Sequence, residues 1–343
     1  MKTFSPSVKG SSCPTVLELC AGGGGQTIGL ELAGFECVAA VEIDSHACST
    51  LRLNRPKMRI VEGDIKEVSA REFSGVDLVS AGVPCPPFSI AGKQLGANDE
   101  RDLFPEALRI VRECRPRAVM LENVPGFAAA KFEPYRQSLI SSLKRLGYSV
   151  GWRVLQSADY GVPQLRPRFL LVGLRHQYAD FFQWPSPCRD SAPTVGETLY
   201  DLMAARGWPG AMNWHKKADR IAPTVVGGSK KHGGPDLGPT RAKAQWRLLG
   251  VDGMGIANEA PGADFPIDAF PLLTVRMVAR LQSFPDSWQF FGKKTASYRQ
   301  VGNAFPPLVA TAVATAIRTS LELEEKGVYP QTEELVSGLV SEV

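Results

Sequence analysis

The sequence predicts an α/β protein in which helices cover both faces of a mostly parallel sheet, together with a smaller, irregular second domain. Two observations lead to this fold class. In the first half of the chain, short β-rich apolar runs alternate with helical patterns, as expected for parallel strands joined by helices. Residues 175–271 are instead rich in Gly, Pro, Trp and Lys and weakly periodic, which indicates loops and short strands.

The elements of the sheet follow one another along the chain. The expected strands are the runs 15–19, 37–41, 76–81 and 118–121, with antiparallel edge strands at 150–155 and 169–172. The expected helices are 26–33, 45–54 and 103–112, and a longer one at 305–323 that two prolines introduce near its first turn. We expect the helix 305–323 to pack back onto the N-terminal sheet, so that both ends of the chain lie in the large domain and the irregular region is inserted between them.

Composition narrows the class of protein. A chain of 343 residues, 44% hydrophobic and 22% charged, is long enough for one large and one smaller domain. We expect a cytoplasmic protein that does not enter a membrane, because there is no signal-like apolar region in the first ten residues and no run of about 18 apolar residues. The seven cysteines are scattered without a C-x-x-C pair, so we expect neither a zinc site nor a disulfide framework.

Positive charge is concentrated in one part of the irregular region. The net charge of the whole chain is +4, but the window from Arg206 to Arg247 holds nine basic and two acidic residues and is therefore +7. The rest of the chain is −3. A localised basic stretch is what a polyanion-binding surface would contain, although a solvated loop would look the same.

A glycine loop follows the first expected strand and opens the first helix. This arrangement lets the backbone approach a nucleotide-like ligand closely. Glu42 ends the next strand, where a carboxylate can bind ribose hydroxyls. The dinucleotide fingerprint fails because Thr27 stands where a third glycine after Gly22 and Gly24 is needed, so the loop favours a ribose-bearing cofactor other than NAD. Asp64 either binds an adenine amino group or simply closes the third strand.

Cys85 lies between two prolines directly after an apolar strand. The carboxyl end of a strand is where α/β sheets place their ligands. Pro84 and Pro86 stiffen the backbone around the thiol, which suits a nucleophile that must be held close to its target. A purely structural Pro-Cys-Pro turn would have the same sequence.

Glu122 ends a strand of large apolar residues. Such a strand is buried, so an acid at its tip either reaches a cleft or is costly to bury. Burial would raise its pKa and make it a proton donor near neutral pH. The alternative is a helix cap, since Glu122 and Asn123 both precede a turn.

Arg166 and Arg168 are two apart in an expected strand and therefore share one face. Two guanidinium groups on one face can clamp a base carbonyl and a nearby phosphate. The alternative is a pair of surface salt bridges.

Taken in order, these blocks resemble the cytosine-C5 DNA methyltransferase family, in its bacterial restriction-modification form. The resemblance covers nearly the whole chain. It rests on the glycine loop, Glu42, Gly63-Asp64, Pro84-Cys85, Glu122-Asn123-Val124, Gln164-x-Arg166-x-Arg168, Arg276-x-x-x-Arg280-Leu281-Gln282-Ser283-Phe284-Pro285 and Gln300-Val301-Gly302-Asn303-Ala304. The chain departs from the family in two places: Pro86 replaces the usual Gln after the cysteine, and Cys20 replaces an aromatic residue in the glycine loop.

The resemblance implies a fold, a reaction and its catalytic residues. The fold would be the Rossmann-like S-adenosylmethionine-dependent methyltransferase fold with a small irregular target-recognition domain. Cys85 would add to C6 of a flipped cytosine, and Glu122 would hydrogen-bond or protonate N3. Arg168 would hold the base O2, with Arg166 supporting it. C5 would then take the methyl group of S-adenosyl-L-methionine.

The resemblance also implies the domains and the binding residues. Residues 1–174 and 273–343 would form the catalytic, cofactor-binding domain, and 175–272 the target-recognition domain. The residues expected to bind the cofactor are Cys20, Ala21, Gly22, Gly24, Gly25, Glu42, Ile43, Asp64, Ile65, Leu103 and Asn303. Those expected to contact double-stranded DNA are Lys216, Lys217, Lys230, Lys231 and Arg241. We expect a monomer without an obligate protein partner.

Three other functions are weighed against this one. The incomplete glycine fingerprint and the Pro-Cys and Glu-Asn-Val blocks argue against a dinucleotide-dependent oxidoreductase. A transfer-RNA cytosine methyltransferase of the same family fits less well, because the long basic insertion favours a duplex. A catalytically dead DNA-binding relative is disfavoured by the presence of Cys85, Glu122 and both arginines.

Overall fold

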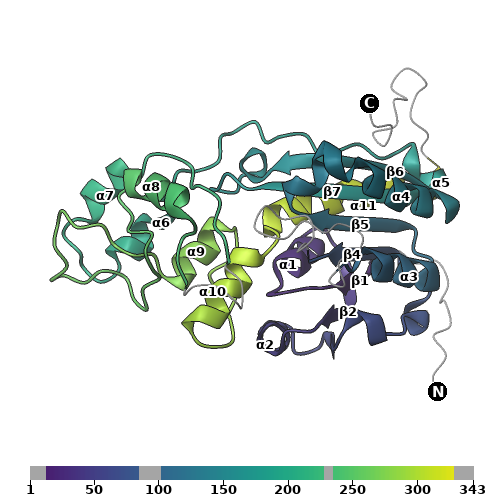
Figure 1. Ribbon diagram of the computed structural model, residues 1–343, viewed down its shortest axis with the longest axis horizontal. Helices are drawn as coiled ribbons and strands as arrows, with labels where there is room; N and C mark the ends of the chain where they lie inside the picture. Colours follow the sequence, from purple (N-terminus) through teal and green to yellow (C-terminus); the bar gives the residue numbers. More distant parts are fainter. Residues whose placement is uncertain (1–12, 85–101, 228–234, 328–343) are drawn as a thin grey trace.

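A seven-stranded sheet forms the centre of the protein (Figure 1). The computed structural model describes residues 13–84, 102–227 and 235–327. The strand order is β3-β2-β1-β4-β5-β7-β6. The strands are β1 (Thr15–Leu19), β2 (Glu36–Glu42), β3 (Arg59–Glu62), β4 (Leu78–Gly82), β5 (Ala118–Asn123), β6 (Tyr148–Gln156) and β7 (Pro167–Arg175).

The sheet confirms the predicted, mostly parallel α/β architecture. Strands β1 to β5 pair in parallel, while β7 runs antiparallel between β5 and β6. The central strands read as continuous apolar runs because both of their faces are buried. Leu78, Val79, Ala118 and Val119, for example, are all fully buried although they point alternately to the two faces.

Helices cover both faces of the sheet. One face packs against α3 (Phe104–Cys114) and α4 (Glu133–Arg145), and the other against α1 (Gly25–Leu32) and α11 (Pro307–Glu325). Helix α2 (Ser45–Asn54) connects β2 to β3. The remaining short elements of this part are α5 (His176–Ala179) and the 3₁₀ helices η1 (Ile65–Glu67), η2 (Arg71–Phe73), η4 (Pro125–Ala128), η5 (Ala130–Phe132) and η6 (Ser157–Tyr160).

Helix α11 returns the end of the described chain to the first strands. A Cβ built on Gly29 would lie 2.4 Å from the Cβ of Ala310, so α1 and α11 approach each other too closely for any other residue at position 29. The segment Lys294–Glu325 is long and apolar enough to cross a membrane by length and composition alone, yet 61% of its apolar 18-residue window is buried inside the protein. Such burial is typical of a helix that packs in a core.

The region 175–271 was predicted to hold loops and short strands. For the part of it that the structure describes, the prediction of short strands is wrong. Its described part contains helices α6 (Val195–Ala204), α7 (Ala211–Lys217) and α8 (Thr240–Leu248), with only isolated bridges such as Arg206–Gly262. Each helix has at most ten residues, so the helical period repeats too few times to stand out. One signal was available: Thr194 and Glu197 form a capping box at the start of α6.

A second apolar core lies beside the sheet. It joins Trp208, Trp214 and Trp246 to apolar residues of α6, α9 (Val275–Leu281) and α10 (Lys294–Asn303). Figure 1 shows α9 and α10 between the sheet and helices α6 to α8. Tyr178 and Trp184, in contrast, pack in the core formed by the sheet and α11. The boundaries of the two domains at 174/175 and 272/273 stay a prediction.

Glu18 gives the stability of this fold a pH dependence. The side chain is fully buried on β1, where Thr27 Oγ1 donates a hydrogen bond to it at 2.7 Å. Burial raises the pKa of Glu18 from 4.5 to about 8. The folded protein therefore holds a proton that the unfolded chain releases above its lower pKa. The stabilisation is present below pH 4.5 and is lost as the pH rises through 8.

In the wild type we expect the free energy of unfolding to fall by up to about 1.4 kcal/mol per pH unit between pH 5 and 8. The substitution Glu18→Gln should abolish this fall, because glutamine does not titrate. Denaturant unfolding across this pH range measures it. Glu36→Gln, at an exposed position of β2, is the control and should leave the slope unchanged. Parallel pH profiles for the wild type and Glu18→Gln would contradict the prediction.

Candidate active site

The glycine loop between β1 and α1 has the backbone of a close-contact turn. Cys20, Gly22 and Gly24 all have positive φ angles, of 54°, 57° and 89°. Glycine adopts this conformation freely, whereas Cys20 does so at a cost of order 1–3 kcal/mol. Strain of this kind is found where a loop must present its backbone to a ligand.

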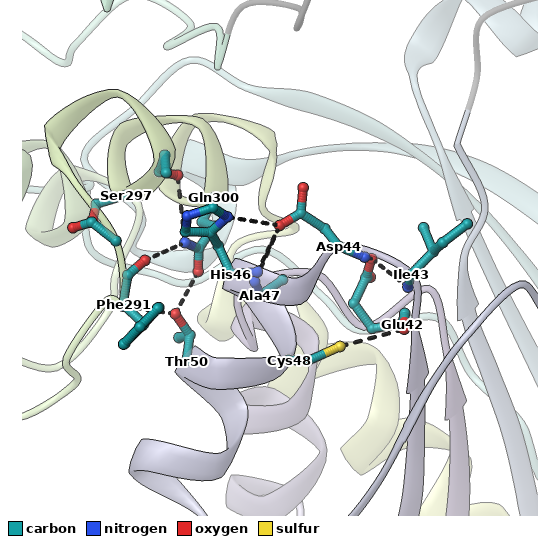
Figure 2. Close-up of polar contacts among 12 residues, drawn as sticks. Glu42, Ile43, Asp44, His46, Ala47, Cys48, Thr50, Phe291, Ser297 and Gln300 are labelled. Carbon is teal, nitrogen blue, oxygen red and sulfur yellow. Dashed lines mark hydrogen bonds and ion pairs between the residues drawn. The ribbon is translucent and has the colours of Figure 1, made fainter.

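Glu42 fixes this loop against the end of β2. One carboxylate oxygen accepts a hydrogen bond from the Gly22 N–H at 2.7 Å. The other accepts from the N–H groups of Ile43 and Asp44 at 2.8 and 2.7 Å. Figure 2 shows Glu42, Ile43 and Asp44 together at the start of α2. A carboxylate oxygen has more than one lone-pair site, so Glu42 keeps the capacity to accept hydroxyl groups of a ligand.

Open space borders the Glu42 carboxylate. A Cβ built on Gly22 or on Gly63 would meet no heavy atom within 4 Å, and the Gly63 N–H donates to the Glu42 carbonyl at 2.9 Å. The side chain of Ile43 is 66% exposed, which is unusual for a residue of its size and apolarity. An acceptor for ribose hydroxyls beside an exposed apolar side chain suits a nucleoside.

The other expected cofactor residues have structural partners. Ala21 is buried and donates its N–H to the Val41 carbonyl at 3.2 Å. Asp64 accepts the Lys66 N–H at 3.0 Å and caps η1. Ile65 is buried, while Leu103 is partly buried and precedes α3. This capping role is neither of the two roles that the sequence offered for Asp64, which were to bind an adenine amino group or to close the third strand. It uses one carboxylate oxygen of Asp64.

Gly24 and Gly25 are covered by the C-terminal part of the chain. A Cβ on Gly24 would lie 2.4 Å from the Trp288 ring, and one on Gly25 would lie 2.3 Å from the Phe305 carbonyl oxygen. The Trp288 indole N–H also donates to the Gly23 carbonyl at 3.0 Å. These two glycines therefore allow close packing, and Trp288 is a contributor to the loop that the sequence reasoning missed.

Gln300 braces the same loop from α10. It lies under Gly23, whose Cβ would be 2.9 Å from the Gln300 Cβ. Its side-chain oxygen accepts a hydrogen bond from the Thr50 hydroxyl at 2.6 Å, and its amide N–H donates to the Phe291 carbonyl at 2.9 Å (Figure 2). Gln300 stood in a recognised sequence block, but nothing in that block indicated its partner 250 residues away.

Glu122 and Arg168 form a buried ion pair at the end of β5. Arg168 Nε lies 2.8 Å from a carboxylate oxygen of Glu122, and both side chains are largely buried. Burial raises the pKa of Glu122, while the charges of Arg168 and Arg166 oppose that rise. Burial also lowers the pKa of Arg168. The carboxyl group is therefore placed where it can carry a proton or stabilise a positive charge.

The segment that leads to Cys85 lies beside Glu122. Gly82 pairs with Glu122 in the sheet, and the Asn123 amide donates to the Val83 carbonyl at 3.4 Å. Cys85 itself lies outside the described residues. The strand that ends two residues before Pro84 is thus fixed directly next to the predicted acid.

Arg166 is bound to the backbone. Its guanidinium donates to the carbonyl oxygens of Val225, Gly302 and Ala304, the last two at 2.7 and 3.0 Å. Burial and the neighbouring charge of Arg168 lower its pKa. Arg166 and Arg168 lie at the same end of β7. Arg168 contacts Glu122, whereas Arg166 contacts backbone carbonyl groups of the surrounding chain.

The remaining predicted residues of the described chain belong to the end of α10 and to α7 and α8. Asn303 is exposed, and its side-chain oxygen lies against Gly227. Lys216, Lys217 and Arg241 are exposed on α7 and α8, with Lys217 Nζ 4.2 Å from the centre of the Phe270 ring. Lys230 and Lys231 lie outside the described residues.

Comparison with known sequences places the chain among DNA-modifying enzymes. Residues 14–319 match the model of the family described as C-5 cytosine-specific DNA methylase. The chain is 54% identical over 316 residues to the type II methyltransferase M.NaeI of Lentzea aerocolonigenes, covering 91% of this chain and 76% of that protein. It is 51% identical over 312 residues to the type II methyltransferase M.NgoMIV of Neisseria gonorrhoeae, covering 90% and 99%.

Solved structures share the fold at lower identity. A protein described as a DNA modification methyltransferase encoded within an Escherichia coli prophage superposes with a TM-score of 0.65 at 23% identity, over 90% of this chain and 99% of that one. DNMT2 of Spodoptera frugiperda gives a TM-score of 0.60 at 20% identity, over 89% and 99%. These two show the fold, and the sequence matches show the family: the chain belongs to the C-5 cytosine-specific DNA methylases.

Proposed function

We propose that this protein transfers a methyl group from S-adenosyl-L-methionine to C5 of a cytosine flipped out of a specific duplex DNA sequence, and so protects DNA in a restriction-modification system. The observation that carries the proposal is the pairing of Gly82 with Glu122. It sets the strand that leads to Cys85 beside a buried carboxyl group paired with Arg168.

The cofactor would bind at the open space beside Glu42. Glu42 accepts the ribose hydroxyls, Ile43 covers the adenine, and Gly22 and Gly63 leave room for both. Cys20 to Gly22 present the backbone, and Asp64 accepts from the adenine amino group. The bound cofactor supplies an electrophilic methyl group.

The Cys85 thiolate would add to C6 of cytosine. This addition breaks the aromaticity of the ring and places carbanion character on C5, which then becomes nucleophilic enough to take the methyl group. A water molecule then takes the C5 proton, the electron pair of that C–H bond re-forms the C5–C6 double bond, and the C6–S bond breaks to release the thiolate. Pro84 and Pro86 limit the backbone around the thiol.

Glu122 and Arg168 would stabilise the charge that develops in the ring. Glu122 in its protonated form donates to N3, and Arg168 donates to O2. Because both groups are buried, these hydrogen bonds are stronger than they would be in water. Arg166 holds three carbonyl oxygens around this point and thereby keeps Arg168 in place.

A stacked cytosine is out of reach of these groups, so the base is flipped. Exposed basic residues of the second region then contact phosphates, while neighbouring base pairs are read in the major groove. Lys216 and Arg241 are exposed for this role. Lys217 is also exposed, but its ammonium group makes a cation–π contact with the Phe270 ring.

We expect Cys85→Ser to abolish methyl transfer, with a loss larger than the roughly 100–1,000-fold that removal of one oxyanion-type donor costs. Bisulfite sequencing of DNA from a host that expresses each variant reports the product and the recognition site together. Cys188→Ser, at an exposed cysteine, is the matched control and should methylate normally. Protected cytosines in the Cys85→Ser host would sink the assignment.

The pH profile of kcat tests the role of Glu122. If its proton is needed, the rate falls as the pH rises through its pKa. Arg168 lowers that pKa, so Arg168→Gln should move the falling limb to higher pH while reducing kcat by about 100–1,000-fold. Glu122→Gln, whose amide donates at every pH, should lack the limb. An unchanged limb in Glu122→Gln would refute this role.

The salt dependence of DNA binding tests the basic surface. We expect Lys216→Ala to flatten the slope of log K against log[salt] by about one unit without changing sequence preference, because it removes one phosphate contact. Lys66→Ala, on a 3₁₀ helix of the sheet domain, serves for comparison. Equal slopes for the wild type and Lys216→Ala would remove this residue from the DNA surface.

A further inference from the structure

Trp288 packs against the glycine loop from the C-terminal part of the chain. Its indole N–H donates a hydrogen bond to the Gly23 carbonyl at 3.0 Å, across 265 positions of sequence. Its ring lies beside Gly24, where a Cβ would come within 2.4 Å of a ring carbon. Trp288 is only 2% exposed, so this hydrogen bond is made in the interior, where an unmatched polar group is costly.

The peptide group between Gly23 and Gly24 is held at both ends. Its carbonyl oxygen accepts from Trp288, and its N–H donates to the Ala21 carbonyl at 3.2 Å. The second bond closes a four-residue turn that has Gly22 and Gly23 at its centre. Glycine adopts either sign of φ freely, so this peptide group would rotate at little cost if it were not held. The Trp288 hydrogen bond therefore selects one orientation of the peptide group and keeps the turn closed.

The closed turn fixes Gly22 against Glu42. Gly22 has a φ of 57°, and its N–H donates to the Glu42 carboxylate at 2.7 Å. A Cβ built on Gly22 would meet no heavy atom within 4 Å, so this residue borders the open space beside Glu42. Opening of the turn would release the Gly22 backbone and deprive Glu42 of a fixed donor. Trp288 thus acts on the cradle through the backbone of the loop.

The end of α2 holds Trp288 in turn. The Asn54 side chain makes two hydrogen bonds with the backbone of Gln289, donating to its carbonyl at 2.7 Å and accepting from its N–H at 2.9 Å. The Arg55 guanidinium lies 4.9 Å from the centre of the Trp288 ring, a cation–π contact, and Glu31 pairs with Arg55 at 2.6 Å. The backbone next to Trp288 and the face of its ring are therefore both fixed.

These contacts form a closed ring around the cradle. Glu42 ends β2, and the chain then enters α2, which ends at Asn54. Residues 54 and 55 hold Trp288, Trp288 holds Gly23, and the neighbouring Gly22 binds Glu42. Because the ring is closed, loss of any one contact weakens the support of the others. Trp288 completes it from a distant part of the sequence.

We propose that Trp288 is a positioning residue for the binding of S-adenosyl-L-methionine. Its indole N–H fixes the peptide group after Gly23, and this keeps the Gly22 N–H on Glu42, whose carboxylate accepts the ribose hydroxyls. The inference rests on the proposed function, because that function names the cofactor. In this role Trp288 moves no proton, so it governs affinity for the cofactor and not the chemical step.

Trp288→Phe keeps an aromatic ring and removes the N–H. We expect the Kd for S-adenosylhomocysteine to rise about five- to tenfold, as loss of one buried hydrogen bond would give. The Kd for duplex DNA should change less than twofold. The KM for S-adenosyl-L-methionine should rise with the first Kd, while kcat at saturating cofactor stays within about twofold. Calorimetry with S-adenosylhomocysteine and fluorescence anisotropy with labelled DNA measure the two binding constants without turnover.

Trp184→Phe is the matched control. Trp184 is 7% exposed, packs edge-on against Phe182 and lies 5.7 Å from the Arg153 guanidinium, in the core formed by the sheet and α11. Its substitution should cost similar stability and leave the Kd for S-adenosylhomocysteine within twofold of the wild type.

Asn54→Ala provides a second route to the same loss. It removes the two hydrogen bonds to Gln289 and leaves both Trp288 and the glycine loop unaltered in sequence. We expect the Kd for S-adenosylhomocysteine to rise severalfold in this variant as well, even if Trp288→Phe folds poorly.

Either of two results would overturn the proposal. One is affinity for S-adenosylhomocysteine within twofold of the wild type in both Trp288→Phe and Asn54→Ala. The other is an equal loss of that affinity in Trp184→Phe, which would mean that any loosening of the core weakens cofactor binding. A wild type that binds S-adenosylhomocysteine but methylates no cytosine would instead refute the proposed function, and that outcome is distinct from unchanged affinity in the variants.

Discussion

The rest of the site depends on the hydrogen bonds between the buried guanidinium of Arg166 and the backbone. The guanidinium donates to the carbonyl oxygens of Val225, Gly302 and Ala304, the last two more than 130 residues away in sequence. Transfer of a cation from water to the protein interior is costly unless hydrogen bonds replace its hydration. The three carbonyl oxygens bind the two terminal nitrogens, while the buried Nε has no hydrogen-bond partner in the part of the chain that the structure describes. One side chain thereby connects three segments of the chain.

Each functional part adjoins one of these segments. Arg168, near the start of β7, reaches Glu122, whereas Arg166 precedes the strand. Ala304 and Phe305 cover Gly25 and so close the back of the glycine loop. Gly302 meets Gly227, which belongs to the second region. The strand end at Glu122, the glycine loop and the second region thus share one anchor, Arg166, whereas Arg168 pairs with the Glu122 carboxylate.

The sequence predicted the sheet well and the second region poorly. Strands such as Thr15–Leu19 and Ala118–Asn123 are buried on both faces, so their apolar runs are continuous and easy to recognise. Glu42 and Glu122 were found because a carboxylate at the end of a buried strand is conspicuous. The short helices α6 to α8 were missed because burial around Trp208, Trp214 and Trp246, and not a long periodic pattern, stabilises them.

The sequence by itself determined the fold class and the family and singled out candidate site residues, because strand patterns and motif chemistry are local properties. Only the tertiary structure decided what surrounds them. It brought Trp288 to Gly23, Gln300 to Thr50 and Tyr298 to both Val226 and Asp236. These contacts join residues between 62 and 265 positions apart, and they depend on close backbone approaches that leave no period or spacing in the sequence.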